Sequence, residues 1–325
     1  MSATVRPMRD AVLETLIERM AADADLFLLS GDFGSPVLDR LRTQYPDRFI
    51  NVGIAEQNLI NVAAGMALEG CKVVAYAIAP FLTLRAFEQI RINLSLMAEF
   101  RPMTVVLIGV GAGFSYTLAG PTHQCLEDLT VMRALPNLDV YCPADWPTAQ
   151  ALVVQCLNRS RISYLRLDAA ALPALPDPLG TGPHLGFRVL RTGGSLVLLA
   201  TGYMSHVALR LTDRLAATGQ TCGVIDLYTL LRFDTSALAG ALAQYATIMS
   251  LEEGFVACGG LDALTLNLVN DYRLRCRVIA HGIPAGYRFG QGSREQLLAK
   301  AGLSEATLWQ QVSHLATCEN APDEI

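Results

Sequence analysis

The chain has 325 residues, of which 52% are hydrophobic and 17% charged, and its formal net charge is -5. This length suffices for two domains of ordinary size. The acidic balance without a basic cluster argues against nucleic acid as a partner. No continuous apolar stretch approaches the roughly 20 residues that span a bilayer, and the first residues lack the apolar core of a secretory signal. We therefore expect a cytoplasmic protein that does not enter a membrane.

Strand patterns alternate with helical patterns along the chain, which predicts an α/β fold with parallel sheets. In the first half, apolar positions predict helices over residues 12–20, 37–44, 56–67, 81–97 and 126–134, and another from Trp146. Strands are predicted between them over residues 26–29, 49–52, 72–77, 103–108, 139–142 and 163–167. These elements predict a doubly wound first domain over residues 1–168.

A proline-rich stretch follows this domain, with Pro173, Pro176, Pro178 and Pro183. Proline fixes a backbone angle and removes a hydrogen-bond donor, so we expect a linker over residues 169–190. Beyond it, strands are predicted over 195–200, 221–226, 246–251 and 277–280, with helices over 205–217 and 305–312. They predict a smaller doubly wound domain over residues 191–325.

Eight cysteines are spread along the chain, and none forms a C-x-x-C pair. A zinc site needs clustered ligands. We therefore expect buried thiols in a reducing compartment and no metal site in this chain.

One carboxylate stands where a strand pattern gives way to a helical pattern. Residues 51–58 read NVGIAEQN, so that Glu56 opens an apolar helix. A helix N-terminus stabilises an anion through its unpaired N–H groups. The alternative is that Glu56 is only an acidic residue in a first helical turn.

One histidine follows a glycine-broken loop that leaves the strand ending at Ile108. Residues 119–124 read AGPTHQ, with Gly109, Gly111 and Gly113 before them. Ligands bind beyond the carboxyl ends of parallel strands, so His123 is placed where chemistry usually occurs. A structural histidine is the alternative.

Together these segments resemble the transketolase family, from its pyrimidine-binding domain to its C-terminus, over nearly the whole chain. The resemblance also rests on SGDFGSP at residues 30–36, RAFEQIR at residues 85–91 and the tail RFGQGSREQLLAKAGLS. It implies a pyrimidine-binding domain followed by a transketolase C-terminal-like domain. It also implies thiamine diphosphate as cofactor, and transfer of a two-carbon ketol unit from a ketose (phosphate) donor to an aldehyde acceptor.

The resemblance implies that Glu56 and His123 are catalytic. In this family the matching glutamate donates a hydrogen bond to N1′ of the aminopyrimidine, for which it must be protonated. That bond favours the imino tautomer, whose 4′-nitrogen removes the proton from thiazolium C2. The matching histidine faces the substrate and stabilises oxygen anions near C2.

The resemblance also implies residues that bind cofactor and substrate. Phe81 is the expected platform for the pyrimidine ring, and core packing is the alternative. The cofactor set that the resemblance implies is Glu56, Phe81, Ile54, Asp32 and Arg85. A sugar phosphate is expected at Arg9, Arg166 and Ser35, because guanidinium groups suit bidentate phosphate binding; both arginines could equally be surface residues.

Two departures from the family pattern concern the substrate. Ala119 replaces the aspartate that usually precedes Gly-Pro-Thr-His, and Gly111 stands near where many transketolases keep another histidine. Both changes remove polar contacts to sugar hydroxyls, so the acceptor could differ from the usual pentose phosphates.

Full-length family members also carry a Gly-Asp-Gly…Asn motif that holds the metal and the diphosphate. Residues 31–33 read Gly-Asp-Phe, and Phe33 cannot allow the backbone approach that glycine permits. We therefore expect Mg²⁺ or Ca²⁺, and the diphosphate of a shared thiamine diphosphate, on a separate N-terminal subunit in an α2β2 assembly.

Other functions stay open. The β subunit of a 2-oxo-acid dehydrogenase has a similar length and domain order. Deoxyxylulose-phosphate synthase shares both motifs and the tail, which makes a related acyloin synthesis possible. A non-catalytic assembly subunit is a third alternative. Glu252 and Glu253, at a predicted strand end, are interpreted as solvated acids near an interface.

Overall fold

Six parallel strands form the first sheet, in a computed structural model that describes residues 4–32, 34–176 and 185–318. Their order is β3-β2-β4-β5-β7-β6. The strands are β2 (Leu26–Ser30), β3 (Phe49–Asn51), β4 (Lys72–Ile78), β5 (Thr104–Val110), β6 (Leu138–Tyr141) and β7 (Ile162–Leu167). A short antiparallel pair, β1 (Val5–Pro7) with β8 (Ala171–Pro173), lies beside them.

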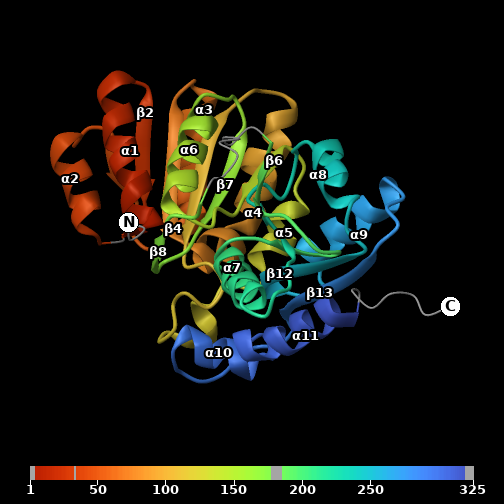
Figure 1. The fold of residues 1–325 in the computed structure, drawn as a ribbon. Coiled ribbons are helices and arrows are strands. Elements are labelled where there is room, and N and C mark those ends of the chain that lie inside the picture. Colours follow the sequence, from red (N-terminus) through yellow and green to blue (C-terminus); the bar gives the residue numbers. More distant parts are fainter. Residues whose placement is uncertain (1–3, 33, 177–184, 319–325) are drawn as a thin grey trace.

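Helices cover both faces of this sheet (Figure 1). Side chains alternate between the faces of a strand, so Leu28 packs with one set of helices and Leu29 with the other. The first set comprises α1 (Met8–Ala22), α2 (Pro36–Gln44) and α6 (Trp146–Leu157). The second comprises α3 (Glu56–Leu68), the helical segment 81–99 and α5 (Asp128–Arg133). The predicted doubly wound arrangement is confirmed.

The helical segment 81–99 is wound more widely than an α-helix. Two π-helical stretches, Phe81–Arg85 and Ile90–Leu96, flank the single α turn α4 (Phe87–Gln89), and a 3₁₀ turn, Met97–Glu99, ends it. The sequence predicts a helix here but not its winding. π-turns inside helices are frequent at functional sites.

The second sheet has five strands in the order β13-β12-β10-β11-β9, parallel except for the antiparallel edge strand β9. The strands are β9 (Phe187–Arg191), β10 (Leu196–Ala200), β11 (Gly223–Leu227), β12 (Thr247–Phe255) and β13 (Arg277–Ile283). One face carries α8 (Thr235–Leu242) and α9 (Leu261–Asp271). The other carries α7 (Tyr203–Ala216), α10 (Arg294–Lys300) and α11 (Glu305–Cys318).

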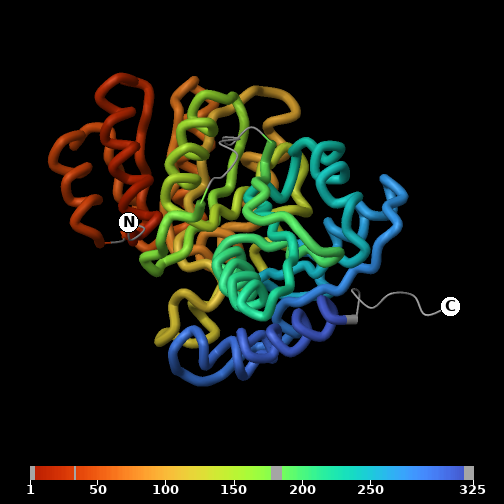
Figure 2. The backbone as a smooth tube through the Cα atoms, in the orientation of Figure 1, coloured from red at the N-terminus to blue at the C-terminus, as the bar shows by residue number. Residues whose placement is uncertain are grey.

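The two α/β units lie directly against each other (Figure 2). The apolar cluster under α3 continues without a break to α8 and α9, so that Val105 of one sheet and Val197 of the other belong to one core. The expected linker, residues 169–190, is partly structured, because β8 and most of β9 fall within it; its residues 177–184 lie outside the described residues. The domain boundaries at residues 168 and 191 stay a prediction.

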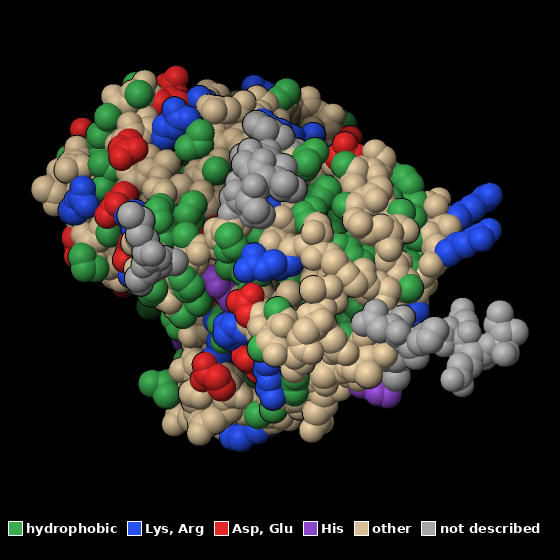
Figure 3. Space-filling view, viewed as in Figure 1, with side chains coloured by type: hydrophobic (Ala, Val, Ile, Leu, Met, Phe, Trp, Pro, Cys, Tyr) green, Lys and Arg blue, Asp and Glu red, His purple; other side chains and the backbone are tan. Residues whose placement is uncertain are grey.

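Charged side chains lie dispersed among hydrophobic and polar groups on the face shown in Figure 3. Within the described ranges, every helix is too short or too polar to cross a bilayer. The seven cysteines whose side chains are described are all free, and four of them are buried. Burial raises the pKa of Cys156 to about 12.

Candidate cofactor and substrate site

Four chain segments that carry the expected site residues follow strands of the parallel sheet. Asp32 follows β2, Glu56 follows β3, Phe81 follows β4 and the His123 loop follows β5. Because these four strands are neighbours and parallel, their carboxyl ends open at one edge of the sheet, where ligands bind in open α/β folds.

Glu56 begins helix α3, as the sequence predicts. Its side chain is only 6% exposed, and its Oε2 lies 2.6 Å from a guanidinium nitrogen of Arg85. The residue before it, Ala55, offers no side-chain cap to the first N–H groups of the helix.

Phe81, Arg85 and His123 complete a continuous cluster with Glu56. The Arg85 guanidinium lies over the Phe81 ring, 4.3 Å from its centroid. The rings of Phe81 and His123 meet edge to face with centroids 5.0 Å apart. The structure therefore brings together four residues that the sequence analysis named from three separate segments.

A groove of about 530 Å³ opens beside this cluster. Its walls come from the π-helical segment, from the Gly-Pro-Thr-His-Gln stretch and from the second domain; they include Phe81, Leu84, Arg85, Pro121, Thr122, Tyr287 and Phe289. Tyr287 and Phe289 are 73% and 80% exposed. A mostly apolar wall with a few polar groups is typical of small-molecule sites.

Tyr116 is a neighbour of His123 that the sequence analysis missed. Its ring centroid lies 6.5 Å from that of His123. A Cβ atom on Gly111 would lie 2.3 Å from the Tyr116 ring, and Gly111 has φ +108°. The ring thus fills the space that a side chain at position 111 would need. The glycines of this loop indicate that another group packs closely against its backbone. The sequence does not show that this group is the Tyr116 ring.

Arg9 lies at the margin of this region. Its Nε donates to Asp10 Oδ1 at 2.7 Å, and its charge acts on the phenol groups of Tyr76 and Tyr116. The side chain is 27% exposed, so the guanidinium can still reach an anion at the sheet edge.

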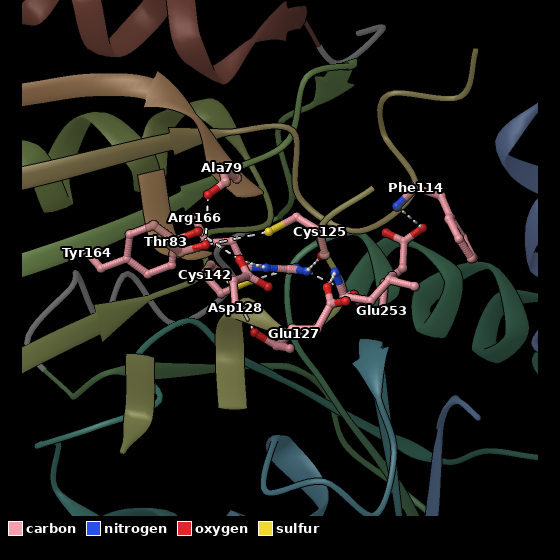
Figure 4. A network of polar contacts seen from close by, with 12 residues as sticks. Ala79, Thr83, Phe114, Cys125, Glu127, Asp128, Cys142, Tyr164, Arg166 and Glu253 are labelled. Atoms are coloured by element: carbon pink, nitrogen blue, oxygen red, sulfur yellow. Dashed lines mark hydrogen bonds and ion pairs between the residues drawn. The ribbon is translucent and has the colours of Figure 1, made fainter. Parts of the chain in front are cut away.

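Arg166 does not fit the phosphate role expected for it. It is 3% exposed, and its Nε donates to Asp128 at 2.8 Å. One terminal nitrogen donates to the carbonyl oxygens of Cys125 and Glu253, at 3.0 and 2.9 Å (Figure 4). A guanidinium so engaged inside the protein has little capacity left for a substrate, and we no longer assign it to the phosphate.

Ser35, Asp32 and Ile54 have clear structural surroundings. Ser35 is buried and caps α2, where its hydroxyl oxygen accepts the Leu38 N–H at 3.2 Å. Asp32 exchanges hydrogen bonds with Asn51, at 3.0 and 3.1 Å, which ties the ends of β2 and β3 together. Ile54 is 78% exposed just before Glu56. Phe33 lies outside the described residues.

The interpretation of Glu252 and Glu253 as solvated acids is wrong, because both are only 2% exposed. Glu253 forms an ion pair with Arg294. Glu252 instead accepts the Asp262 N–H at 3.2 Å, at the start of α9, and burial raises its pKa to about 7.

These residues fit the aminopyrimidine half of thiamine diphosphate. A nearly buried carboxyl group, Glu56, pairs with an arginine that lies over an aromatic ring, Phe81, and this ring lines an open groove. Among the described residues, no group of three or more His, Cys, Asp or Glu side chains is arranged to hold a metal ion.

Two family profiles match the chain. Residues 5–174 match the pyrimidine binding domain of transketolase, and residues 186–308 match the transketolase C-terminal domain. The chain therefore belongs to the transketolase family.

Several curated relatives are similar over most of this chain. One subunit of the apulose-4-phosphate transketolase of Actinobacillus succinogenes is 29% identical over 80% of this chain and 82% of its own. A 6-deoxy-6-sulfo-D-fructose transketolase subunit of Clostridium sp. (strain MSTE9) is 28% identical over 91% and 90%. A 1-deoxy-D-xylulose-5-phosphate synthase of Parasynechococcus marenigrum is 31% identical over 76% of this chain but only 38% of its own length.

A solved structure described as a split gene transketolase, inactive beta4 tetramer, superimposes with a TM-score of 0.85. It is 28% identical, and the match covers 97% of this chain and all of that one. The fold, and not only the local motifs, is therefore shared along both domains.

Proposed function

We propose that this chain is a subunit of a thiamine-diphosphate-dependent transketolase, which transfers a two-carbon ketol unit from a ketose (phosphate) donor to an aldehyde acceptor. The observation that carries the proposal is the cluster of Glu56, Arg85, Phe81 and His123, of which Phe81 and Arg85 line the groove. A carboxyl group, an aromatic platform and a histidine next to one another are what cofactor activation and substrate binding would need.

In this proposal, different residues of the chain bind the cofactor and the substrate. Phe81 is the platform for the pyrimidine ring, which must share the Phe81 ring with the Arg85 guanidinium that lies over it. Ile54 and Asp32 lie nearby at the sheet edge, and Glu56 holds a proton toward the ring nitrogen N1′. When bound, thiamine diphosphate supplies a carbon centre that stabilises a carbanion. His123 stands beside Phe81, placed to donate to a substrate oxygen, and Arg9 is left as the candidate for a substrate phosphate.

Arg85 is part of this arrangement. Its guanidinium pairs with Glu56 Oε2 at 2.6 Å and lies over the Phe81 ring, so it connects the carboxyl group with the aromatic platform.

We further propose a separate N-terminal subunit that holds the diphosphate and Mg²⁺ or Ca²⁺, in an α2β2 assembly. Two of the relatives are themselves named as transketolase subunits, and the matching structure is described as a split-gene protein. Free cysteines suit a reducing compartment, and we place the complex in the cytoplasm.

The test is the Glu56→Gln variant in the complex reconstituted with the partner subunit. Positioned proton transfer contributes roughly 10²–10⁴-fold to rate, so we expect turnover of a ketol donor to fall by that order. Glu88→Gln, in the same helical segment as Phe81 and Arg85 and paired only with Arg91 on the surface, serves as matched control. Equal turnover of the Glu56→Gln and wild-type complexes would exclude the proposal.

The same assay separates the enzymatic alternatives. A ketol donor consumed without release of CO₂ indicates transketolase. Pyruvate consumed with release of CO₂ indicates a deoxyxylulose-phosphate synthase-like reaction, which the similarity to that synthase favours, or a 2-oxo-acid dehydrogenase. A complex that binds the cofactor but converts no donor indicates an assembly subunit.

A further inference from the structure

Glu253 belongs to the second domain but reaches the loop that carries His123. It lies in β12, and its Oε1 accepts the backbone N–H of Phe114 at 3.3 Å (Figure 4). A Cβ atom on Gly113 would lie 2.5 Å from the Glu253 carboxyl carbon. Only glycine at position 113 therefore permits this approach.

The loop of residues 113–125 is closed at the point where Glu253 touches it. Gly113 and Cys125 exchange two backbone hydrogen bonds of 3.0 Å. Arg166 donates to the Cys125 carbonyl and also to the Glu253 carbonyl. Side chain and backbone of Glu253 are thus linked to both ends of the loop, and His123 lies two residues before the closing Cys125.

Arg294 fixes Glu253 in turn. Its Nε donates to Glu253 Oε1 at 2.9 Å, and a terminal nitrogen pairs with Oε2 of the same carboxylate. Another nitrogen lies 2.7 Å from Asp168, directly after β7 of the first domain. The guanidinium also lies over the Tyr203 ring at 3.6 Å. Arg294 comes from the tail motif, for which the proposed function has no use.

We propose that Glu253 and Arg294 are positioning residues, through which the C-terminal domain holds the base of the 113–125 loop and thereby the place of His123. Both side chains are more than nine-tenths buried, and an ionised pair makes stronger and better-defined hydrogen bonds than neutral groups. The catalytic consequence rests on the proposed function; the hold on the loop does not.

Amide hydrogen exchange of the chain without its partner tests the hold on the loop. In Glu253→Ala we expect the Phe114 amide and those of residues 115–125 to exchange at least tenfold faster. Glu252→Ala is the matched control, because it removes an adjacent buried carboxylate that caps α9 instead. There the loop should stay within twofold of wild type, while the Asp262 amide exchanges faster.

Equal acceleration of the loop in both variants, or none in Glu253→Ala, would overturn the inference. Should Glu253→Ala fail to fold, Glu253→Gln and Glu252→Gln give the same comparison, because Gln preserves size and removes the charge that holds Arg294.

Kinetics of the reconstituted complex test the consequence for catalysis. Glu253→Gln should lower kcat at least tenfold and leave the Kd for thiamine diphosphate within twofold, because Glu56 and Phe81 are untouched. An unchanged kcat alongside a loosened loop would refute the positioning role. A wild-type complex that binds no thiamine diphosphate would refute the proposed function and leave the exchange result standing.

Discussion

Glu252 is a buried acid that forms no ion pair with another described residue, unlike its neighbour Glu253. Its carboxylate accepts the Asp262 N–H, and one oxygen would lie 2.2 Å from a Cβ atom on Gly260. Desolvation is the main cause of its raised pKa; hydrogen bonds from Leu261 and Asp262 and the charge of Arg166 lower it, and the charge of Asp262 raises it. The ionised form of Glu252 is therefore costly in the folded protein.

This cost makes stability depend on pH. The pKa of Glu252 is about 7 in the folded chain against a usual 4.5, so between these values the folded state binds more protons than the unfolded state. Stability must then fall as pH rises through that window, by about 3 kcal/mol in all, because each pKa unit is worth about 1.4 kcal/mol.

Glu252→Gln should therefore match wild type near pH 5 and be more stable near pH 8. Gln resembles the protonated acid in size and cannot ionise. Urea unfolding at the two pH values measures the difference. The same stability difference at both values would show that Glu252 does not titrate in this range.

Single residues also show what the sequence could not reveal. Glu56 and His123 could be named as candidates from the sequence, because each stands in a short motif. The burial of Arg166 and Glu253 could not be predicted, because their partners come from distant segments, Asp128 and Arg294 respectively. Charged residues are exposed by default, and only the fold shows which are buried in pairs.

At the scale of elements, Ser35 is best understood as the cap of α2. Its hydroxyl accepts the Leu38 N–H, and Pro36 follows at the first helical position, a combination typical of helix starts. Helix capping therefore explains a serine at position 35 without any contact to a substrate.

Ser35→Ala should lower the free energy of unfolding by about 1 kcal/mol, as measured by chemical denaturation. Ser35→Asp should preserve stability, because aspartate caps a helix equally well. The Asp variant also tests the phosphate role that the family resemblance implies. A raised KM for a phosphorylated donor in the Asp variant would restore that role, whereas an unchanged KM leaves Ser35 a helix cap only.

The helical segment 81–99 illustrates another limit of sequence reasoning. Its apolar positions correctly predict a helix, because the buried side chains recur roughly once per turn. The π-helical winding at Phe81–Arg85 rotates the side chains by only part of a turn relative to an α-helix. The spacing of apolar residues in the sequence cannot resolve so small a rotation. Yet this winding decides how Phe81 and Arg85 meet, and hence the form of the candidate site.

At the scale of the molecule, two domains were predictable from the restart of the strand–helix alternation after the proline-rich stretch. The packing of the two domains into one shared core was not predictable. One apolar core extends under both sheets, and its members are ordinary Val and Leu residues that look the same in sequence whether they face their own domain or the other. The antiparallel edge strand β9 was missed for a similar reason, since its sequence FRVLR has arginines among its apolar residues.

Arg188, one of these arginines, joins the two domains. Its Nε donates to Asp226 of β11 at 2.9 Å, and a terminal nitrogen lies 3.1 Å from Asp145 at the start of α6. Asp145 also accepts the N–H groups of Thr148 and Leu175. Burial raises the pKa of Asp226 even beside this arginine. Both carboxylates are fully buried, so water cannot solvate their charges if Arg188 is removed.

Arg188→Met should therefore destabilise the whole chain and not one domain. Removing one partner of a buried pair costs about 3–5 kcal/mol, and the shared core couples the two sheets, so calorimetry should show a single transition displaced to lower temperature. Arg191→Met, which removes a surface pair with Asp213 and a local hydrogen bond to the Leu190 carbonyl, should stay within about 1 kcal/mol of wild type. Two separate transitions in either protein would mean that the domains fold independently, and that Arg188 stabilises only their contact.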